Sequence, residues 1–115
     1  MGDLSQNFSS REFVCHHCGA LPRLDEELLQ LLQRMRTRKG RPLRIVSGYR
    51  CEPHNRAVGG SKGSQHLSGR AADVPGGYAD VQAWWREGAV GIGVRDGQVV
   101  HVDTRRDRKP FTFAD

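Results

Sequence analysis

The sequence predicts a small α+β domain in which one long helix and shorter helices pack on an antiparallel sheet. Leucines at helical spacing indicate one amphipathic helix between residues 25 and 40. Two alternating apolar segments flank Asp96-Gly97, which is the strongest short signal for a β-hairpin. The chain has 115 residues, the usual size of one domain, so we expect a single domain over residues 1–115.

The long helix is expected to open with Asp25-Glu26-Glu27 and to close at Gly40. Four apolar residues follow the i, i+3, i+4, i+7 pattern of a buried helix face: Leu28, Leu31, Leu32 and Met35. Acidic residues at its start and basic residues at its end suit the helix dipole. Gly40 supplies the glycine with which many helices end.

The segments after this helix alternate between short elements and loops. Residues 43–47 alternate and predict a strand, whereas residues 48–69 are rich in Gly, Ser, Asn and His and predict a long functional loop. Residues 70–74 predict a second strand. Residues 80–87 predict a short helix with Asp80 as its N-cap.

The hairpin follows, with strands over residues 90–94 and 99–103, and the basic and aromatic residues 105–115 close the chain without an assigned element. Side chains alternate along a strand, so we expect two faces on the second hairpin strand. One face carries Val99, His101 and Asp103, and the other, toward the core, carries Val100 and Val102.

Charge and hydropathy narrow the possible partners. Lys plus Arg number 18 and Asp plus Glu number 13, so the formal charge is +5 and favours an anionic partner: nucleic acid, anionic lipid or cell wall. Unbroken aliphatic runs are too short to span a bilayer, and the first ten residues lack the pattern of a secretory signal. We therefore expect no membrane insertion and synthesis in the cytoplasm without a signal peptide.

Three residues could bind a catalytic metal ion. His66 lies in a Gly/Ser-rich segment seven residues before Asp73, and His101 follows on the hairpin. Two imidazoles and one carboxylate leave the fourth position of a tetrahedral Zn²⁺ open for water, which is the catalytic arrangement. A surface histidine and a capping aspartate are the alternatives for these residues taken singly.

The motifs around these residues are similar to those of a known family. They are Ser47-Gly48-Tyr49-Arg50, Asn55, Gly59-Gly60, Ser64-x-His66-x-x-Gly69-x-Ala71-x-Asp73 and His101-x-Asp103. The chain resembles, from about Phe13 to Asp103, the zinc peptidases of bacterial peptidoglycan. That family includes D-alanyl-D-alanine carboxypeptidases and dipeptidases and the L-alanyl-D-glutamate endopeptidases of phage endolysins, and it shares its fold with the Hedgehog signalling domain.

The resemblance implies a role for each matched residue. The zinc ligands would be His66, Asp73 and His101. The substrate-binding residues would be Ser64, Arg50, Tyr49 and Asn55, and Arg50 would also act in catalysis by facing the substrate carbonyl or carboxylate. A guanidinium suits both roles, since it stabilises an oxyanion and binds a carboxylate through two hydrogen bonds.

The sequence does not decide which residue acts as the general base. Many relatives carry Asp or Glu three residues before the last histidine ligand, where this chain has Gln98. Asp103, which follows His101 by two residues, is the favoured active-site carboxylate, either as the base or as a partner of a zinc ligand. Asp96 at the hairpin tip is a second candidate, and binding of zinc and substrate with poor cleavage is a third possibility.

The cysteines form a separate question. Cys15-x-x-Cys18 and Cys51-x-x-His54 supply a Cys₃His set, which is typical of structural zinc. A disulfide with one free thiol, or three reduced thiols, are the alternatives, and His16 or His17 could replace His54.

These observations lead to three hypotheses of function. The first is a zinc peptidase, expected to be a monomer, that cleaves peptidoglycan stem peptides and acts on the cell wall in the periplasm or outside the cell. The second is a catalytically weak zinc-containing wall-binding module of a phage or wall assembly. The third is a nucleic-acid-binding zinc knuckle, although nucleic acid is not the expected partner.

Overall fold

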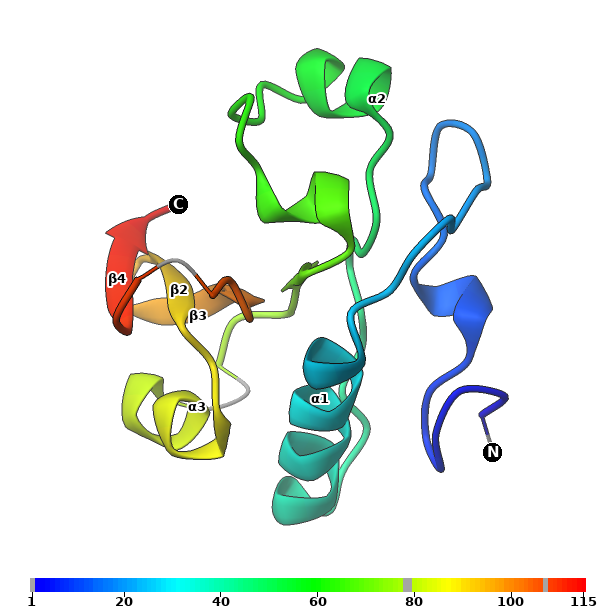
Figure 1. Cartoon of the computed structure of the whole chain (residues 1–115). Helices are drawn as coiled ribbons and strands as arrows, with labels where there is room; N and C mark the ends of the chain where they lie inside the picture. Colours follow the sequence, from blue (N-terminus) through cyan, green and yellow to red (C-terminus); the bar gives the residue numbers. More distant parts are fainter. Residues whose placement is uncertain (1, 78–79, 107) are drawn as a thin grey trace.

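Four strands form one mixed sheet in the order β1-β3-β2-β4 (Figure 1). The computed structural model of the chain describes residues 2–77, 80–106 and 108–115. The strands are β1 (Ala71–Asp73), β2 (Gly91–Arg95), β3 (Gln98–Asp103) and β4 (Phe111–Ala114). β3 pairs antiparallel with both β1 and β2, whereas β4 runs parallel to β2.

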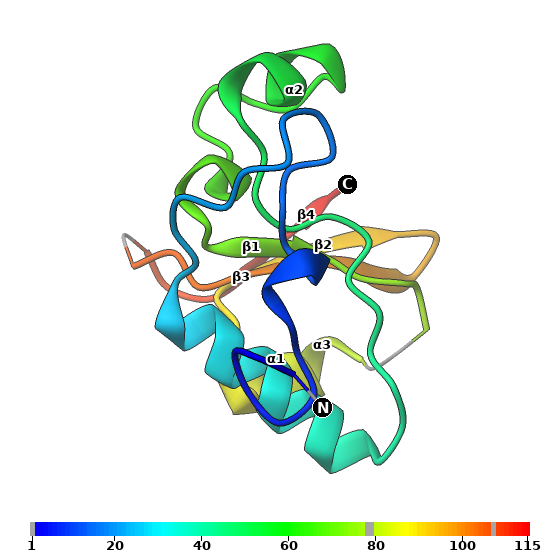
Figure 2. The same ribbon diagram turned by 90° about the vertical axis from the view of Figure 1, so that its right-hand side faces the viewer.

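The helices lie on both sides of this sheet. They are η1 (Ser10–Glu12), α1 (Glu26–Lys39), α2 (Glu52–Ala57), η2 (Gln65–Ser68) and α3 (Val81–Glu87). Figure 2 shows α1 and α3 below the sheet and α2 above it. Among the described residues no helix combines the length and the apolar character that crossing a membrane requires.

The two predicted helices are confirmed, together with their ends. Asp25 caps α1 by accepting a hydrogen bond from the Leu28 N–H at 3.3 Å, and Gly40 ends it with a φ of 68°. Asp80 caps α3 in the same way. These ends are set by local chemistry, because a carboxylate satisfies free N–H groups and glycine adopts the left-handed conformation without strain.

One hydrophobic core lies between the helices α1 and α3 and one face of the sheet. α1 contributes its predicted apolar face, and Trp84 of α3 is fully buried beside it. Ile92 of β2 and Val102 of β3 supply the sheet side of the core and pair directly with each other. The opposite face of the sheet is therefore left for side chains outside this core, His101 and Asp103 among them.

The α+β class is confirmed, but the expected antiparallel sheet is wrong in one respect. Residues 111–114, to which no element was assigned, form the edge strand β4 and pair parallel with β2. The Phe111 N–H donates to Val90 O at 3.0 Å, and the Asp115 N–H donates to Val94 O at 3.0 Å. Such pairing depends on a partner distant in sequence, which a four-residue alternation alone does not reveal.

Two further predictions need correction. Residues 43–47 do not form a strand: they make only an isolated bridge between Ser47 and Asp73, although Leu43 and Ile45 are buried as the alternation predicted. The segment 48–69 is not one continuous loop, because it contains α2 and η2. Pro53 in the first turn of α2 and the side chain of Ser64 before η2 favour these short helices.

The side chains of β3 do not alternate strictly between the two faces of the sheet, because the strand contains a β-bulge. Gly93 pairs with His101 and Val94 pairs with Val99, so Val100 is an extra residue in β3. The extra residue reverses the alternation, and Val99 joins the core with Val102 instead of sharing a face with His101. His101 and Asp103 stay together on the other face, as expected.

Candidate active site

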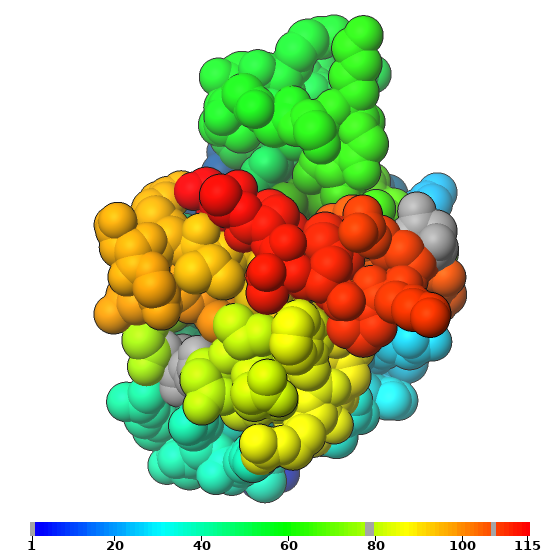
Figure 3. All heavy atoms as spheres, turned by 90° about the vertical axis from the view of Figure 1, so that its left-hand side faces the viewer, coloured from blue at the N-terminus to red at the C-terminus, as the bar shows by residue number. Residues whose placement is uncertain are grey.

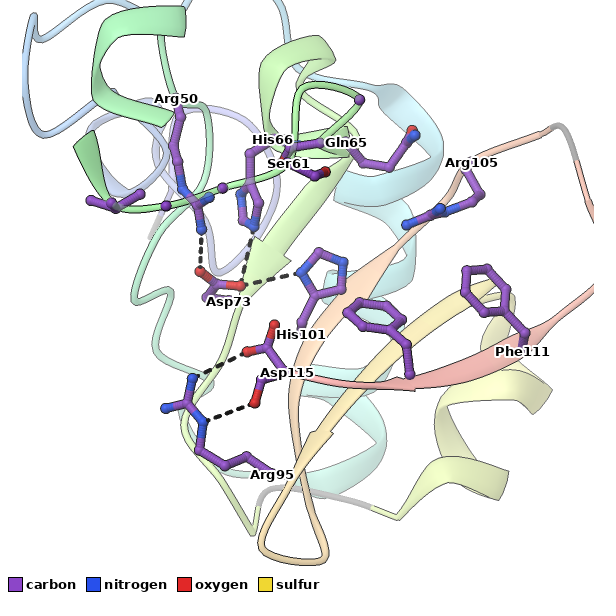
Figure 4. Close-up of a pocket in the computed structure, with 16 residues that line it drawn as sticks. Arg50, Ser61, Gln65, His66, Asp73, Arg95, His101, Arg105, Phe111 and Asp115 are labelled. Carbon is purple, nitrogen blue, oxygen red and sulfur yellow. Dashed lines mark hydrogen bonds and ion pairs between the residues drawn. The ribbon is translucent and has the colours of Figure 1, made fainter. Parts of the chain in front are cut away.

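Three potential metal ligands converge on the polar face of the sheet. His66 comes from η2, Asp73 from the end of β1 and His101 from β3, where it pairs directly with Asp73 across the ladder. Asp73 Oδ1 lies 3.1 Å from His66 Nε2 and 3.3 Å from His101 Nδ1 (Figure 4). One ligand atom from each residue lies within 4.8 Å of the other two.

Both imidazoles are held so that one ring nitrogen faces this point. His66 Nδ1 lies 2.7 Å from Gly48 O, and His101 Nε2 lies 2.9 Å from Asp103 Oδ2. A ring N–H that donates to these oxygens leaves the lone pair on the other nitrogen, His66 Nε2 and His101 Nδ1. Metal-binding histidines in proteins are oriented in this way, so the residues fit a zinc ion.

The charges of the site suit metal binding as well. Burial raises the pKa of Asp73, but hydrogen bonds with His101 and His66 outweigh it, and the pKa lies well below its ordinary value. Asp73 therefore stays ionised, as a carboxylate ligand must. Burial lowers the pKa of His101, but its hydrogen bonds to Asp103 and Asp73 raise it by more, so a metal ion at this ring competes with a proton.

Asp103 is fully buried behind His101. Its two carboxylate oxygens accept hydrogen bonds from Arg105 Nε at 2.9 Å and Nη2 at 2.6 Å, and from the Gly91 N–H at 3.1 Å. Burial raises its pKa, but hydrogen bonds from His101 and Arg105 outweigh this effect and lower the pKa well below its ordinary value. Asp103 thus contacts His101, one of the three potential metal ligands, and does not line the pocket.

Two glycines make room for these side chains on the polar face of β2. A Cβ on Gly91 would collide with the Asp103 carboxylate, and a Cβ on Gly93 would lie 2.8 Å from that of His101. Glycine inside a strand is unfavourable by itself, so its presence here is explained by the close approach of both residues.

Arg50 closes the other side of the metal-ligand group. Its Nη2 contacts Asp73 Oδ2 at 2.8 Å and its Nη1 donates to Asn55 Oδ1 at 3.1 Å. Only 14% of its side chain is exposed. The guanidinium is therefore fixed beside Asp73, where it binds the carboxylate oxygen that does not face the histidines.

A pocket of about 520 Å³ opens over the three ligands. It lies between the loop that follows α2 and the strand β4, which are the green and red surfaces above and below it in Figure 3. Besides the predicted residues, its lining includes five that the sequence did not single out: Arg95, Arg105, Phe111, Phe113 and Asp115. The regular Phe111-x-Phe113 spacing was the available signal, since it places both rings on one face of a strand.

Of the predicted substrate-binding residues, Arg50 and Ser64 line this pocket. Asn55 is buried beside it, where its side chain binds Arg50 and donates to Ser61 O at 2.8 Å. Tyr49 is not among the lining residues and lies near the cysteines: burial raises its pKa, and the charges of Cys18, Cys51 and Cys15 add to this effect.

The usual base position and the hairpin tip both lie away from the pocket. Gln98 is exposed at the start of β3 against the turn at Gly76, and Asp96 is exposed in the hairpin turn with a φ of 52°. Neither lines the pocket, and the carboxylates that line it in the described part of the chain belong to Asp73 and Asp115.

The three cysteines also come together, in a second group. Their sulfur atoms lie within 4.8 Å of one another, all three are free thiols, and the Cys15 and Cys51 sulfurs are 3.6 Å apart. Burial raises the pKa of Cys15, but hydrogen bonds from the backbone of Cys51, Cys18 and His17 outweigh it and lower the pKa to about 6. His54 lies on α2, which follows Cys51, but its side chain is not part of the group of atoms within 4.8 Å of one another.

His66, Asp73 and His101 form a group that could hold a metal ion, and the family of the chain indicates a metallopeptidase. The family model of peptidase M15 matches residues 6–103, which is most of the chain, and the chain belongs to this family. The family is zinc-dependent, in agreement with the ligand set described above. Comparison with curated proteins gave no significant match.

Proposed function

We propose that this chain is a zinc peptidase that hydrolyses peptide bonds in the stem peptides of peptidoglycan, acting on the cell wall. The convergence of His66, Asp73 and His101 at the base of an open pocket is the observation that carries the proposal. Three protein ligands are the number that a catalytic zinc site uses, because the remaining position is needed for water or substrate.

Zinc held by these residues would activate a water molecule and polarise the scissile carbonyl. His66 would bind it through Nε2, His101 through Nδ1 and Asp73 through Oδ1, because these atoms face one another. Gly48 O and Asp103 hold the two rings in this orientation. Arg50 lines the pocket beside Asp73 and would stabilise negative charge that develops on the substrate oxygen.

We assign Asp103 a positioning role and not that of the general base. It is fully buried, and both of its oxygens are occupied by Arg105, His101 and the Gly91 N–H. A general base must reach the water that it deprotonates. Asp115 lines the pocket and is 31% exposed in its ion pair with Arg95, so it is the carboxylate we propose as proton acceptor.

The pocket has features that suit a stem peptide. Arg50 and Arg95 are cations for carboxylates of the peptide, and Phe111 and Phe113 supply an apolar wall beside them. Stem peptides combine small apolar side chains with free carboxylates, which is why the net charge of +5 favours the cell wall over a neutral substrate.

Digestion of purified peptidoglycan followed by mass spectrometry of the released fragments tests the function. We expect new peptide termini with the zinc-loaded protein, none after treatment with a chelator, and recovery on addition of zinc. His66→Ala should abolish cleavage, whereas Gln98→Ala, outside the pocket, should cleave like the native chain. Loss of a terminal D-Ala would define a carboxypeptidase, and a new D-Glu N-terminus an L-Ala-D-Glu endopeptidase.

The same experiment separates the other hypotheses. Binding to sacculi without new termini would contradict a peptidase and support a wall-binding module. Cleavage that persists in His66→Ala would refute the assigned metal centre. Binding to nucleic acid that weakens steeply with salt and is unchanged by His101→Ala would favour the zinc-knuckle hypothesis.

A further inference from the structure

The cysteine group lies outside the candidate active site and plays no part in the mechanism proposed above. Cys15 and Cys18 belong to the loop that follows η1, and Cys51 is the N-cap residue directly before α2. In Figures 1 and 2 this loop (blue) lies beside α2 (green), so two segments distant in sequence meet at the cysteines.

The distances suit thiolates around one metal ion. With Zn–S bonds of about 2.3 Å, two sulfurs of a tetrahedral zinc site are separated by about 3.8 Å. The Cys15 and Cys51 sulfurs are 3.6 Å apart, and Cys18 completes a group within 4.8 Å. A disulfide would require about 2.05 Å between two of the sulfurs.

The backbone around Cys15 is folded in a way that supports a metal site. The Gly19 N–H donates to Cys15 O at 2.8 Å and the Cys15 N–H donates to Ala20 O at 2.9 Å, which closes a tight turn. Gly19 takes a φ of 74°, a conformation that glycine adopts without strain. The Cys51 N–H points to Cys15 Sγ at 3.4 Å, a contact that stabilises charge on sulfur.

His54 is the residue that could supply a fourth ligand. His54 is half-buried on the first turns of α2, three residues after Cys51. Its ring centroid lies 6.4 Å from that of His16 and 6.1 Å from that of His17, both of which are exposed on the cysteine loop. His54 is the least exposed of the three and is attached to the same helix as a cysteine of the group.

We propose that Cys15, Cys18 and Cys51, with His54 as fourth ligand, bind a second zinc ion of structural function. This site would join the N-terminal loop to α2 and to the residues just before it. The Tyr49 N–H already donates to Phe13 O at 2.9 Å, and Arg50 immediately precedes Cys51. The second zinc ion would therefore fix the wall of the pocket that carries Arg50.

Metal analysis of the purified full chain tests this proposal independently of catalysis. We expect two zinc ions per native chain, one in His66→Ala and one in Cys18→Ser. Cys18 is exposed, so its replacement should leave the hydrophobic core intact. The zinc that remains in His66→Ala should exchange for Co²⁺ and give strong sulfur-to-cobalt absorption, which Cys18→Ser should lack.

His54→Gln tests the fourth ligand, with the exposed His16→Gln as its matched control. We expect at least tenfold weaker zinc binding at the cysteine site in His54→Gln and native binding in His16→Gln. Equal affinities in the two variants would overturn the assignment of His54. A native chain with one zinc ion that is lost only in His66→Ala would overturn the second site. A mass two units lower than that of the reduced chain would also overturn it, because it would show a disulfide between two of the cysteines.

The two proposals fail separately. Cleavage by a native chain that holds one zinc ion, lost only in His66→Ala, would refute the structural zinc alone. Two zinc ions in a protein that releases no peptide would refute the peptidase alone.

Discussion

Replacing Asp103 by Asn distinguishes a positioning residue from a general base. The substitution keeps the shape of the side chain and removes its charge. One carboxylate oxygen receives His101 Nε2 and Arg105 Nη2, and the other receives Arg105 Nε and the Gly91 N–H. In either orientation of the amide, its NH₂ group would face donors, so one set of hydrogen bonds would be lost.

The size of the effect follows from this geometry. Breaking a buried ion pair by removing one partner costs about 3 to 5 kcal/mol of stability. Because 20% of the Arg105 side chain is exposed and can be hydrated, we expect the lower end, about 3 kcal/mol. Losing the acceptor behind a histidine ligand weakens metal binding by about 10- to 100-fold, which corresponds to about 1.4 to 2.7 kcal/mol.

The assay is competition for zinc against a chelator of known affinity, combined with kcat measured at saturating zinc. We expect weaker zinc binding in Asp103→Asn and a kcat within about tenfold of the native value once the site is filled. A loss of kcat of about 10² or more with native zinc affinity would identify Asp103 as the base and refute this reasoning. Asp96→Asn, in the exposed hairpin turn, is the control and should match the native chain.

Three other substitutions test neighbouring parts of the site. Asp115→Asn should lower kcat by about 10²-fold at unchanged zinc affinity, and an unchanged kcat would exclude Asp115 as proton acceptor. Arg50→Lys should lower kcat/KM by about 10²-fold, because an ammonium group cannot make the two guanidinium contacts to Asp73 and Asn55 at once. If zinc affinity falls by the same factor, Arg50 acts through Asp73 instead. Gly91→Ala should destabilise the chain by about 1 to 3 kcal/mol in urea unfolding, because its Cβ meets the Asp103 carboxylate; Gly63→Ala, where a Cβ meets open space, is the control, and equal stabilities would contradict the steric argument.

The parts of the fold that could be predicted are those fixed by nearby residues. The caps at Asp25 and Asp80, the glycine at the end of α1 and the Asp-Gly turn of the hairpin all act within four residues of the element they define. The strand β4 could not be found in this way, because its partner β2 supplies the hydrogen bonds that make it a strand.

In the candidate site, too, some features could be predicted from the sequence and others depend on contacts distant in sequence. The motifs that contain His66, Asp73 and His101 resemble those of the zinc peptidases, so their convergence could be anticipated from the resemblance more than from the spacing alone. The position of Val99 in the core could not, because the bulge at Val100 arises from pairing with β2. Arg105 was missed because its partner is a buried carboxylate two residues away, which charge counting along the sequence does not distinguish from a solvated pair.

The residues from Ser47 to Cys51 connect both proposed metal sites, although they form no strand. Ser47 O accepts a hydrogen bond from the Asp73 N–H at 2.8 Å, Gly48 O orients His66, and Arg50 binds the second carboxylate oxygen of Asp73. The same segment packs against Phe13 in the N-terminal part of the chain. Gly48 lies so close to Phe13 that a Cβ on Gly48 would be 2.8 Å from the Phe13 Cα.

The positions of the proposed zinc ligands His66 and Asp73 therefore depend on a backbone segment that has little regular secondary structure. A metal ion bound by Cys51 at the end of this segment would restrain it in addition to these hydrogen bonds. Loss of the cysteine site should then weaken zinc binding at the site of His66 as well. The coupling is measured by chelator competition at the His66 site, in Cys18→Ser and in the native chain. Identical affinities at the catalytic site would show that the segment is held by its packing on Phe13 and not by the cysteines.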